Sequence, residues 1–249
     1  MKLTIIGPWA PYPSAEGACP GYLLEISNRK LLLDCGNGVI SKLQRYIKLE
    51  ELDLVVLSHW HPDHHADLQC LRHARAGKRR EDAQLTPIVV LAPKNPADLF
   101  GQYSGYTEAF QFKDSSSLPN YKLDSEAGLI TLIFKPTNHP MFNLATKVSY
   151  QGQTLVYVGD TGWDDSLIPF LEGVDLVLIE ASLQDKDIEF TKLGHLTARQ
   201  AAALCQRAGV KKVVLTHFWP EHDLIIHLKE AREEFSEVQL AIEGASWEI

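Results

Sequence analysis

The sequence predicts an α/β protein arranged as a four-layer αββα sandwich, in which helices cover the outer faces of two stacked sheets. Short apolar runs bounded by Gly, Pro or Asp recur along the chain and fall into two successive groups. Such runs are typical of strands buried on both faces, and burial on both faces requires helices outside each sheet. We therefore expect two similar halves, although the sequence shows no detectable repeat between them.

The expected strands end at or near polar residues. The first group lies at residues 3–6, 31–33, 54–57 and 88–91, and the second at residues 129–134, 155–158, 176–179 and 213–215. The strands of the second group lead, in order, to His139, Asp160, Glu180 and His217. These side chains are candidates for a site, because ligands of such sheets bind near the carboxyl ends of strands.

Three segments have the spacing and boundary signals of helices. Apolar side chains recur at helical intervals in residues 37–49, and residues 224–235 form another helical segment. Residues 197–208 begin with Thr197, a favoured N-cap residue, and precede Gly209, a favoured residue after a helix end.

Residues 93–124 depart from this pattern, being rich in Tyr, Phe, Ser and Pro. We expect them to be an insertion in a single domain of residues 1–249, with a helix at residues 95–103 followed by a mobile loop. The loop is a candidate lid or contact between the subunits of a homodimer, with ordinary packing as the alternative. Apolar surface for these roles comes from Tyr103, Tyr106, Phe110 and Phe112.

Composition narrows the function classes. A chain of 249 residues with 45% hydrophobic content is long enough for one well-buried domain. The formal charge of −8 argues against a protein that holds nucleic acid mainly by phosphate neutralisation. The four cysteines are isolated, no run approaches the roughly 18 apolar residues of a membrane span, and the N-terminal apolar stretch is too short for a secretory signal. We expect a reduced cytoplasmic protein with no membrane partner.

The strongest motif is the stretch HWHPDHHAD at residues 59–67. It places His59, His61, Asp63 and His64 directly after the expected strand 54–57. Imidazole nitrogen and carboxylate oxygen suit zinc and similar divalent ions. Ligands this close in sequence cannot all reach one ion without straining the loop, so we expect two ions about 3.5–4 Å apart. A solvated His-rich loop is the alternative.

Three strand-end residues complete two metal shells. Each would be costly to bury without a partner, and a hydrogen-bonded strand-end residue is the alternative for each. A water shared by two ions has a pKa of about 7 and supplies hydroxide at neutral pH. The expected ligands are His59, His61 and His139 for the first ion, Asp63, His64 and His217 for the second, and Asp160 as the bridge between them.

With this set, the chain resembles the metallo-β-lactamase superfamily. The resemblance rests on Asp34, the HxHxDH motif at 59–64, His139, Asp160 and His217, in that order over nearly the whole chain. It implies the αββα fold, a dinuclear metal site at the sheet edges, and hydrolysis by a metal-bound hydroxide. Asp34 is expected to anchor the backbone rather than bind metal, and Asp67 to be a helix-capping neighbour.

Within the superfamily, the stretch GHLTA at 194–198, followed by Ala201-Ala202, resembles the ribonuclease Z branch. The resemblance implies that His195 contacts the scissile phosphate as an acid or hydrogen-bond donor, and that Glu180 orients His195. An imidazole fixed by a carboxylate can donate to a phosphoryl oxygen or protonate the leaving alkoxide. The alternatives are a surface histidine at a helix N-terminus and a structural ion pair.

Two departures from ribonuclease Z bear on the substrate. Bacterial members carry a long tRNA-binding arm where this chain has only a short turn and two strands, between His139 and Asp160, so tRNA is not an expected substrate. The first residue of that branch's His-Glu-Ala-Thr stretch is Ile179 here. The chain is thus most similar to compact hydrolases near ribonuclease Z, with cyclic nucleotide phosphodiesterases and arylsulfatase-like enzymes as neighbours.

The expected function is a dinuclear metallohydrolase that cleaves a small phosphodiester, with a cyclic nucleotide as one candidate. A metal-bridging hydroxide attacks phosphorus, His195 assists the phosphoryl oxygens or leaving group, and Asp63 orients the nucleophile. The alternatives are a sulfate-ester, thioester or lactone hydrolase on the same site, and a metal-bound sensor or scaffold. Zinc is the expected metal, with manganese and iron as alternatives.

Aromatic residues flank the ligands in sequence, namely Trp60, Trp163, Phe218 and Trp219. Some are expected to line a pocket and stack on a nucleobase or aryl group, with core packing as the alternative. The remaining histidines lack strand-end placement and are left outside the expected site, namely His65, His73, His222 and His227.

Overall fold

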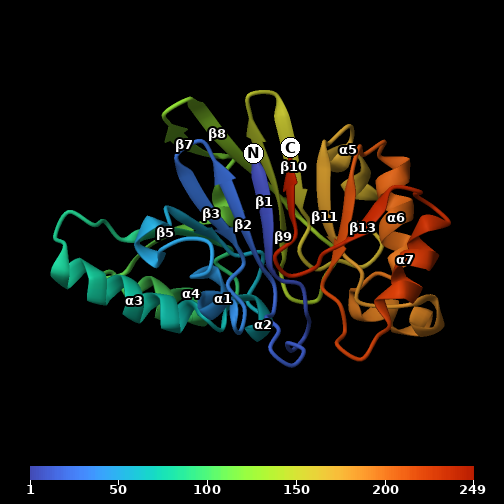
Figure 1. The fold of residues 1–249 in the computed structure, drawn as a ribbon, viewed down its shortest axis with the longest axis horizontal. Coiled ribbons are helices and arrows are strands. Elements are labelled where there is room, and N and C mark those ends of the chain that lie inside the picture. Colours follow the sequence, from blue (N-terminus) through green and yellow to red (C-terminus); the bar gives the residue numbers. More distant parts are fainter.

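The computed structural model describes residues 1–249 and consists of two seven-stranded sheets stacked face to face, with helices on both outer faces (Figure 1). The predicted αββα sandwich is confirmed. The two sheets share one pairing pattern, in which three antiparallel strand pairs are followed by three parallel pairs. The halves are therefore similar in structure, as expected, without a repeat in sequence.

Every predicted strand is present. The first sheet has the order β14-β1-β2-β3-β4-β5-β6 and the second the order β13-β12-β11-β10-β9-β8-β7. The strands of the first sheet are β1 (Lys2–Gly7), β2 (Gly21–Ile26), β3 (Arg29–Leu33), β4 (Leu54–Val56), β5 (Ile88–Ala92), β6 (Phe110–Asp114) and β14 (Ser246–Glu248). Those of the second sheet are β7 (Tyr121–Ser125), β8 (Gly128–Pro136), β9 (Leu144–Tyr150), β10 (Gln153–Tyr157), β11 (Leu176–Glu180), β12 (Val213–Thr216) and β13 (Val238–Leu240).

Helices α1, α3 and α4 lie on the side of the first sheet, and α5, α6 and α7 on the side of the second (Figure 1). The α-helices are α1 (Val39–Leu43), α2 (Pro62–His65), α3 (Leu68–Glu81), α4 (Ala97–Ser104), α5 (Ile168–Leu171), α6 (Ala198–Arg207) and α7 (Leu224–Arg232). Short 3-10 helices are η1 (Leu49–Glu51), η2 (Ser115–Ser117), η3 (Asp165–Leu167) and η4 (Asp185–Leu193). No helix has both the length and the apolar character needed to cross a membrane.

Successive side chains of the inner strands pack into different cores. On β1, Ile5 belongs to the core cluster that joins the facing sides of the sheets, whereas Ile6 belongs to the cluster that includes residues of α1 and α3. On β4, Val56 and Val55 divide in the same way. Because both faces are covered, these strands are largely apolar in sequence, and their charged residues are confined to their ends.

Helix α6 is capped as predicted and fixes the chain that precedes it. The Thr197 hydroxyl accepts the backbone N–H of Gln200, and the Gln200 side chain accepts the backbone N–H of Thr197. This reciprocal pair satisfies two donors that a helix N-terminus leaves open. The buried face of α6 packs against β11 and β12, so the start of the helix is held directly after His195.

The helix predicted at residues 37–49 is shorter than expected, since α1 ends at Leu43. The apolar spacing of the segment continues to Tyr46 and Ile47, of which Tyr46 is exposed and Ile47 is buried. Residues after Leu43 form turns that lead to η1, and Ile47 reaches the core from this non-helical segment. The pattern therefore overestimated the helix because a buried apolar residue after a turn fits helical spacing by chance.

In the segment 93–124, the predicted helix is present as α4, but the prediction of a mobile loop after it is wrong. The chain instead forms β6, which pairs in parallel with β5, and β7, which pairs with β8. Each is an edge strand with polar residues among its apolar ones, so neither shows the continuous apolar run used to detect strands. The roles of lid and subunit contact stay predictions.

Candidate metal centre

Loops that follow strands of both sheets meet at one edge of the sandwich and bring the predicted site residues together. Asp34 follows β3, the HxHxDH motif follows β4, His139 follows β8, Asp160 follows β10 and His217 follows β12. The carboxyl ends of these strands thus supply nearly all the candidate ligands, as the placement rule for sheet proteins predicts.

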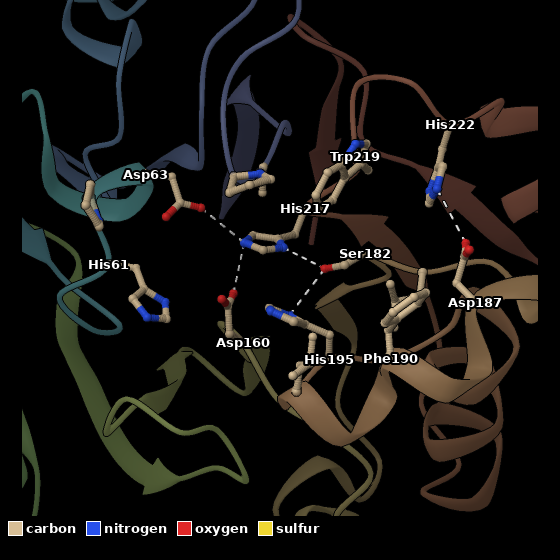
Figure 2. A pocket seen from close by; sticks show the side chains of 15 residues that line it. His61, Asp63, Asp160, Ser182, Asp187, Phe190, His195, His217, Trp219 and His222 are labelled. Atoms are coloured by element: carbon tan, nitrogen blue, oxygen red, sulfur yellow. Dashed lines mark hydrogen bonds and ion pairs between the residues drawn. The ribbon is translucent and has the colours of Figure 1, made fainter.

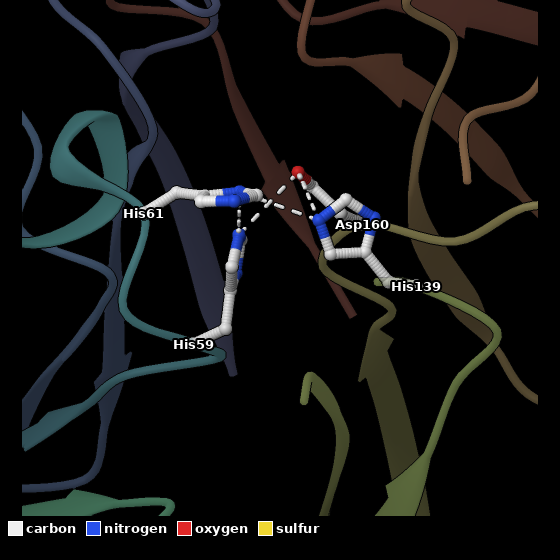
Figure 3. Close-up of side chains that lie close together, drawn as sticks. All are labelled: His59, His61, His139 and Asp160. Carbon is white, nitrogen blue, oxygen red and sulfur yellow. Dashed lines mark hydrogen bonds and ion pairs between the residues drawn. The ribbon is translucent and has the colours of Figure 1, made fainter. Parts of the chain in front are cut away.

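The first group of candidate ligands contains His59, His61, His139 and Asp160 (Figure 3). Nδ1 of His61 lies 2.9 Å from Nε2 of His59 and 3.3 Å from Nε2 of His139. Oδ2 of Asp160 lies 3.5 Å from His59 Nε2 and 3.8 Å from His139 Nε2. Ligand atoms bound at about 2.0–2.1 Å around a tetrahedral ion are about 3.3–3.4 Å apart. The four side chains fit one zinc-sized ion.

The second group contains Asp63, His64 and His217. Nε2 of His64 lies 3.1 Å from Nε2 of His217, and Oδ2 of Asp63 lies 3.4 Å and 3.5 Å from these two nitrogens. The other oxygen of Asp160, Oδ1, is 3.5 Å from His64 Nε2 and 3.1 Å from His217 Nε2. Asp160 thus directs one oxygen at each group, which is the placement expected of a bridge.

The hydrogen bonds of His64 and His217 show why a cation fits between these rings. His64 Nδ1 donates to Asp34 Oδ2 at 2.7 Å. His217 Nδ1 donates to Ser182 Oγ at 2.8 Å, because the Ser182 hydroxyl gives its own proton to Glu180 Oε2 at 2.6 Å. Both Nε2 atoms therefore turn lone pairs toward each other, which is repulsive unless a proton or metal ion lies between them.

Asp160 gives a second indication of a bound cation. It is buried, and its Oδ1 forms no hydrogen bond. An unsatisfied buried carboxylate oxygen is costly, whereas a metal ion bound there removes the cost. The preceding Gly159 has φ 67°, and a Cβ at that position would lie 2.5 Å from Oδ1 of Asn143. Only glycine lets the chain turn so closely before Asp160.

Asp34 anchors the centre as expected, without belonging to either ligand group. Its two carboxylate oxygens accept hydrogen bonds from the Ser58 backbone, the Ser58 hydroxyl, His64 Nδ1 and the Tyr157 hydroxyl. Asp34 has φ 56° and His217 has φ 62°, a region that residues other than glycine rarely adopt. Such backbone strain at two residues of one site is typical of functional positions held by their surroundings.

Asp67 holds a neighbouring loop. Its Oδ2 accepts the backbone N–H of Ile40 at the start of α1, and it forms no side-chain cap on its own helix, α3. Asp67 is therefore a structural residue, but the helix it contacts through its side chain is α1.

The electrostatics of the two groups favour the metal-binding forms of both carboxylates and of His59, but not of His64. Burial opposes ionisation of Asp160 and Asp63, but the neighbouring His217 and His64 outweigh burial and lower the pKa of both carboxyls. Burial lowers the pKa of His59 and keeps its ring neutral. At His64, by contrast, Asp160 and Asp63 outweigh burial and raise the pKa. A metal ion bound to this group would therefore compete with a proton for His64.

His195 lies beside both groups and is fixed by Glu180. Its Nδ1 is 2.9 Å from Glu180 Oε1, and its ring stacks on that of His217 with centroids 5.7 Å apart. Burial would lower the pKa of His195, but Glu180 outweighs burial and raises this pKa to about 9. A ring nitrogen of His195 also lies within 4.8 Å of ligand atoms of Asp160 and His217.

Gly194 sets the position of His195 relative to His139. Its φ is 90°, and a Cβ there would lie 2.5 Å from the Pro140 ring. Its carbonyl accepts a hydrogen bond from His139 Nδ1 at 3.0 Å, which leaves Nε2 of His139 for the first group. One glycine thus links a candidate ligand to the candidate donor.

A cavity of about 750 Å³ opens over the two groups (Figure 2). This volume lies within the range of small-molecule sites. At its base are His61, Asp63, Asp160, His195 and His217. Apolar side chains on its walls are those of Pro11, Leu183, Phe190, Leu193 and Trp219.

The aromatic residues that flank the candidate ligands in sequence lie in different environments. Trp219 lines the cavity, as predicted for some of them. Trp60 and Phe218 are buried in the core, which was the alternative. Trp163 lies outside the cavity lining, with the Arg207 guanidinium 5.6 Å from its ring centroid.

Two ionisable residues of the cavity lining were missed by sequence reasoning. His222 was left outside the expected site, and Asp187 was not considered, yet both line the cavity. Neither directly follows a strand, so the placement rule carried no signal for them. Ser182, which joins Glu180 to His217, lies two residues after Glu180, in the stretch compared with the His-Glu-Ala-Thr sequence of ribonuclease Z, and was within reach of that comparison. The ligand groups contain none of His65, His73 and His227.

Comparisons with known proteins agree with this architecture. Residues 29–218 match the model of the β-lactamase superfamily domain. The chain is 35% identical, over the full length of both proteins, to a Bacillus subtilis protein named "Probable metallo-hydrolase YhfI". The crystal structure of the metallo-β-lactamase fold protein YhfI from that organism superposes with a TM-score of 0.91 at 31% identity, covering 99% of this chain and 98% of that one.

A more distant relative is the ribonuclease Z of Ignicoccus hospitalis. It is 26% identical over 292 residues, which cover 94% of this chain and 93% of that protein. By family match, full-length similarity and its His/Asp metal-binding cluster, the chain belongs to the metallo-β-lactamase superfamily, as a compact metallo-hydrolase similar to ribonuclease Z.

Proposed function

We propose that the protein cleaves small phosphodiesters with two divalent metal ions, one held by His59, His61 and His139 and one by Asp63, His64 and His217, with Asp160 between them. The observation that carries the proposal is the His195–Glu180 pair beside both groups. Ester hydrolysis at carbon needs mainly stabilisation of one oxyanion. Phosphodiester cleavage also benefits from a donor to the phosphoryl oxygens or the leaving oxygen.

Each residue at the base of the cavity has a distinct task in this proposal. Bound divalent ions would activate water and neutralise charge on the phosphoryl oxygens, with zinc as the proposed metal and manganese or iron as alternatives. Asp63 lies at the cavity surface and orients the attacking water. Glu180 holds the proton on Nδ1 of His195, so that the other ring nitrogen can donate toward the phosphate or leaving oxygen.

The proposed substrate is small, with a cyclic nucleotide as one candidate. The relative named ribonuclease Z supports phosphodiester chemistry. The stretch from His139 to Asp160 contains β9, β10 and connecting turns, and the net charge of −8 disfavours a polynucleotide bound along an extended surface. A tRNA is therefore not the proposed substrate.

The test is turnover of bis(4-nitrophenyl) phosphate by zinc-loaded and manganese-loaded protein, with His195→Ala beside it. We expect metal-dependent turnover that falls at least about 100-fold in the variant, the usual scale for a positioned acid. The matched control is His73→Ala, which removes an exposed histidine of α3. Wild-type protein that holds two ions and cleaves only sulfate esters, thioesters or lactones, or cleaves nothing, would contradict the proposal.

Metal content separates two roles for His195, because one of its nitrogens lies near Asp160 and His217. If His195 is a donor, as proposed, His195→Ala retains two ions per chain by elemental analysis. Loss of one ion in this variant would instead make His195 a ligand, and the loss of turnover would then not report a donor.

We also propose a homodimer with segment 93–124 at its interface. This segment contributes helix α4 and the edge strands β6 and β7, one in each sheet. Light scattering coupled to size exclusion should give twice the chain mass. A monomer across a wide concentration range would rule the dimer out.

A further inference from the structure

The cavity extends beyond the metal groups to a second histidine–carboxylate pair, His222 and Asp187. In Figure 2, Phe190 separates this pair from His195, and the pair lies on the far side of the cavity from His61 and Asp63. Both residues line the same cavity as the metal groups. One molecule bound there can therefore contact the metal groups at one end and Asp187 at the other.

Asp187 is held in place while keeping one oxygen free. Its Oδ2 lies 3.4 Å from His222 Nε2 and accepts the backbone N–H of Gln184 at 3.3 Å. No hydrogen bond or ion pair reaches Oδ1, and no Lys or Arg pairs with this carboxylate. The pair is fixed from behind, because the His222 ring packs against those of Trp219 and His227 at centroid distances of 6.4 Å and 5.4 Å.

His222 does not cancel the charge of Asp187. Burial lowers the pKa of His222, and Asp187 only partly opposes this effect. The imidazole is thus neutral at pH 7, so no cationic side chain pairs with the Asp187 carboxylate. A carboxylate without a cationic partner, at the end of a cavity, is an acceptor for a hydrogen-bond donor of a ligand.

The cavity wall between the two ends is apolar, and its side chains are unusually exposed to solvent. Phe190, Leu193 and Trp219 are 46%, 55% and 39% exposed, although large apolar side chains usually avoid water. A flat aromatic ring bound against such a wall would cover this surface. The cavity therefore combines an anion-binding base, an apolar wall and a distal acceptor.

On the basis of the proposed function, we infer that the substrate carries, besides its phosphodiester, a planar ring with an N–H donor, and that Asp187 accepts this donor while Phe190 and Trp219 face the ring. The chemical class is that of phosphate esters of amino-substituted heterocyclic nucleosides. Asp187 would then be a specificity-determining residue, which selects the ring by its exocyclic amine.

Calorimetry on the metal-loaded protein tests this inference with two probes that differ by one amine, adenosine 5′-monophosphate and purine riboside 5′-monophosphate. We expect the amine to improve the dissociation constant about tenfold, the scale of a hydrogen bond to a charged group. In Asp187→Asn the ratio of the two dissociation constants should fall close to one, because an amide replaces the carboxylate acceptor. The amide oxygen can still accept the Gln184 N–H, so the variant keeps the local fold.

Glu189→Gln is the matched control, because Glu189 is an exposed acid of the same helix η4 and does not line the cavity. It should retain the tenfold preference. Equal affinity of wild-type protein for the two probes, no binding of either, or a preference that survives Asp187→Asn would overturn the inference. Binding is measured on products, so these outcomes are independent of bis(4-nitrophenyl) phosphate turnover, which alone decides the proposed function.

Discussion

The two ends of the cavity both contain histidines, but the structure places them in opposite situations. At the metal end, nitrogens of different imidazoles approach to 2.9–3.3 Å, with Asp63 and Asp160 among them. At the far end, His222 meets one carboxylate at 3.4 Å, and His227 lies buried behind it with Gln184 as its side-chain partner. Histidine content alone does not make a metal site.

The difference lies in where the second nitrogen of each ring is directed. At the metal end, Asp34, Ser182 and the Gly194 carbonyl take the protons of three rings, so the remaining nitrogens converge with free lone pairs. At the far end, Nδ1 of His222 and Nε2 of His227 are buried without partners and form no ligand group. Convergence of lone pairs, rather than burial, distinguishes a metal-binding histidine.

The largest effect that would sharpen this contrast is expected for Asp160→Asn. An amide cannot bridge two cations as a carboxylate does, and metal charge stabilisation is worth several kcal/mol. We expect loss of at least one ion per chain by elemental analysis and a fall in kcat of about 1,000-fold or more. Asp187→Asn, the same change at the other end, should keep both ions. Retention of two ions in Asp160→Asn would contradict the bridge.

The second-largest effect is expected on the pH dependence of folding stability, through the buried His227 at the far end of the cavity. Burial lowers the pKa of His227 to about 4, below its ordinary value of 6.5. As the pH falls below 6.5, the unfolded chain therefore binds the proton first. The stabilisation is complete above pH 6.5 and is lost between pH 6.5 and 4, by up to about 3 kcal/mol.

Denaturant unfolding of wild-type protein and His227→Asn across this window measures that loss. The asparagine can keep an acceptor for the Gln184 side chain but does not titrate, and its curve should be flatter by the stated amount. His222 and Asp187 are the titratable side chains that act on the pKa of His227, and both are present in both proteins. Parallel curves of stability against pH for the two proteins would show that His227 binds its proton equally well in the folded and unfolded states.

A smaller effect is expected for Glu180→Gln at the metal end. The change weakens the hold on His195 and on Ser182, which both bond to this carboxylate. Substitution of groups that orient functional histidines usually costs 10- to 100-fold, so we expect a fall of about that size in kcat with both ions retained. Loss of an ion would instead mean that Glu180 acts mainly through Ser182 and His217.

The smallest effect is expected on the wall between the two ends. Trp219→Ala removes a half-exposed ring from the cavity and should raise KM for aromatic phosphodiesters by about tenfold, the lower part of the range for ring stacking. The change in kcat should be less than about twofold, because the ring of Trp219 packs against Tyr12 and His222 rather than against a candidate ligand. Trp163→Ala, outside the cavity, is the matched control. An equal rise of KM in both variants would remove the wall from substrate binding.

Much of the fold and of the candidate site follows from local sequence. The continuous apolar runs identify strands such as β4 and β10 because both of their faces are covered, and polar residues at their ends then stand out. The HxHxDH motif is local to one loop, so its convergence needs little long-range information. Edge strands β6 and β7 were missed because a strand with an open edge does not need a continuous apolar run.

By itself, the sequence predicted eight of the fourteen strands, the residue types that gather at the sheet edge, and their division into two ligand groups. Only the tertiary structure decided which atoms meet, such as Nε2 of His64 and His217, 153 residues apart. It also decided that Asp34 receives four hydrogen bonds, and that Asp187 and His222 share a cavity with the metal groups. The physical reason is that these contacts join loops of different strands, whose approach depends on how the two sheets stack and leaves no periodic signal in the chain.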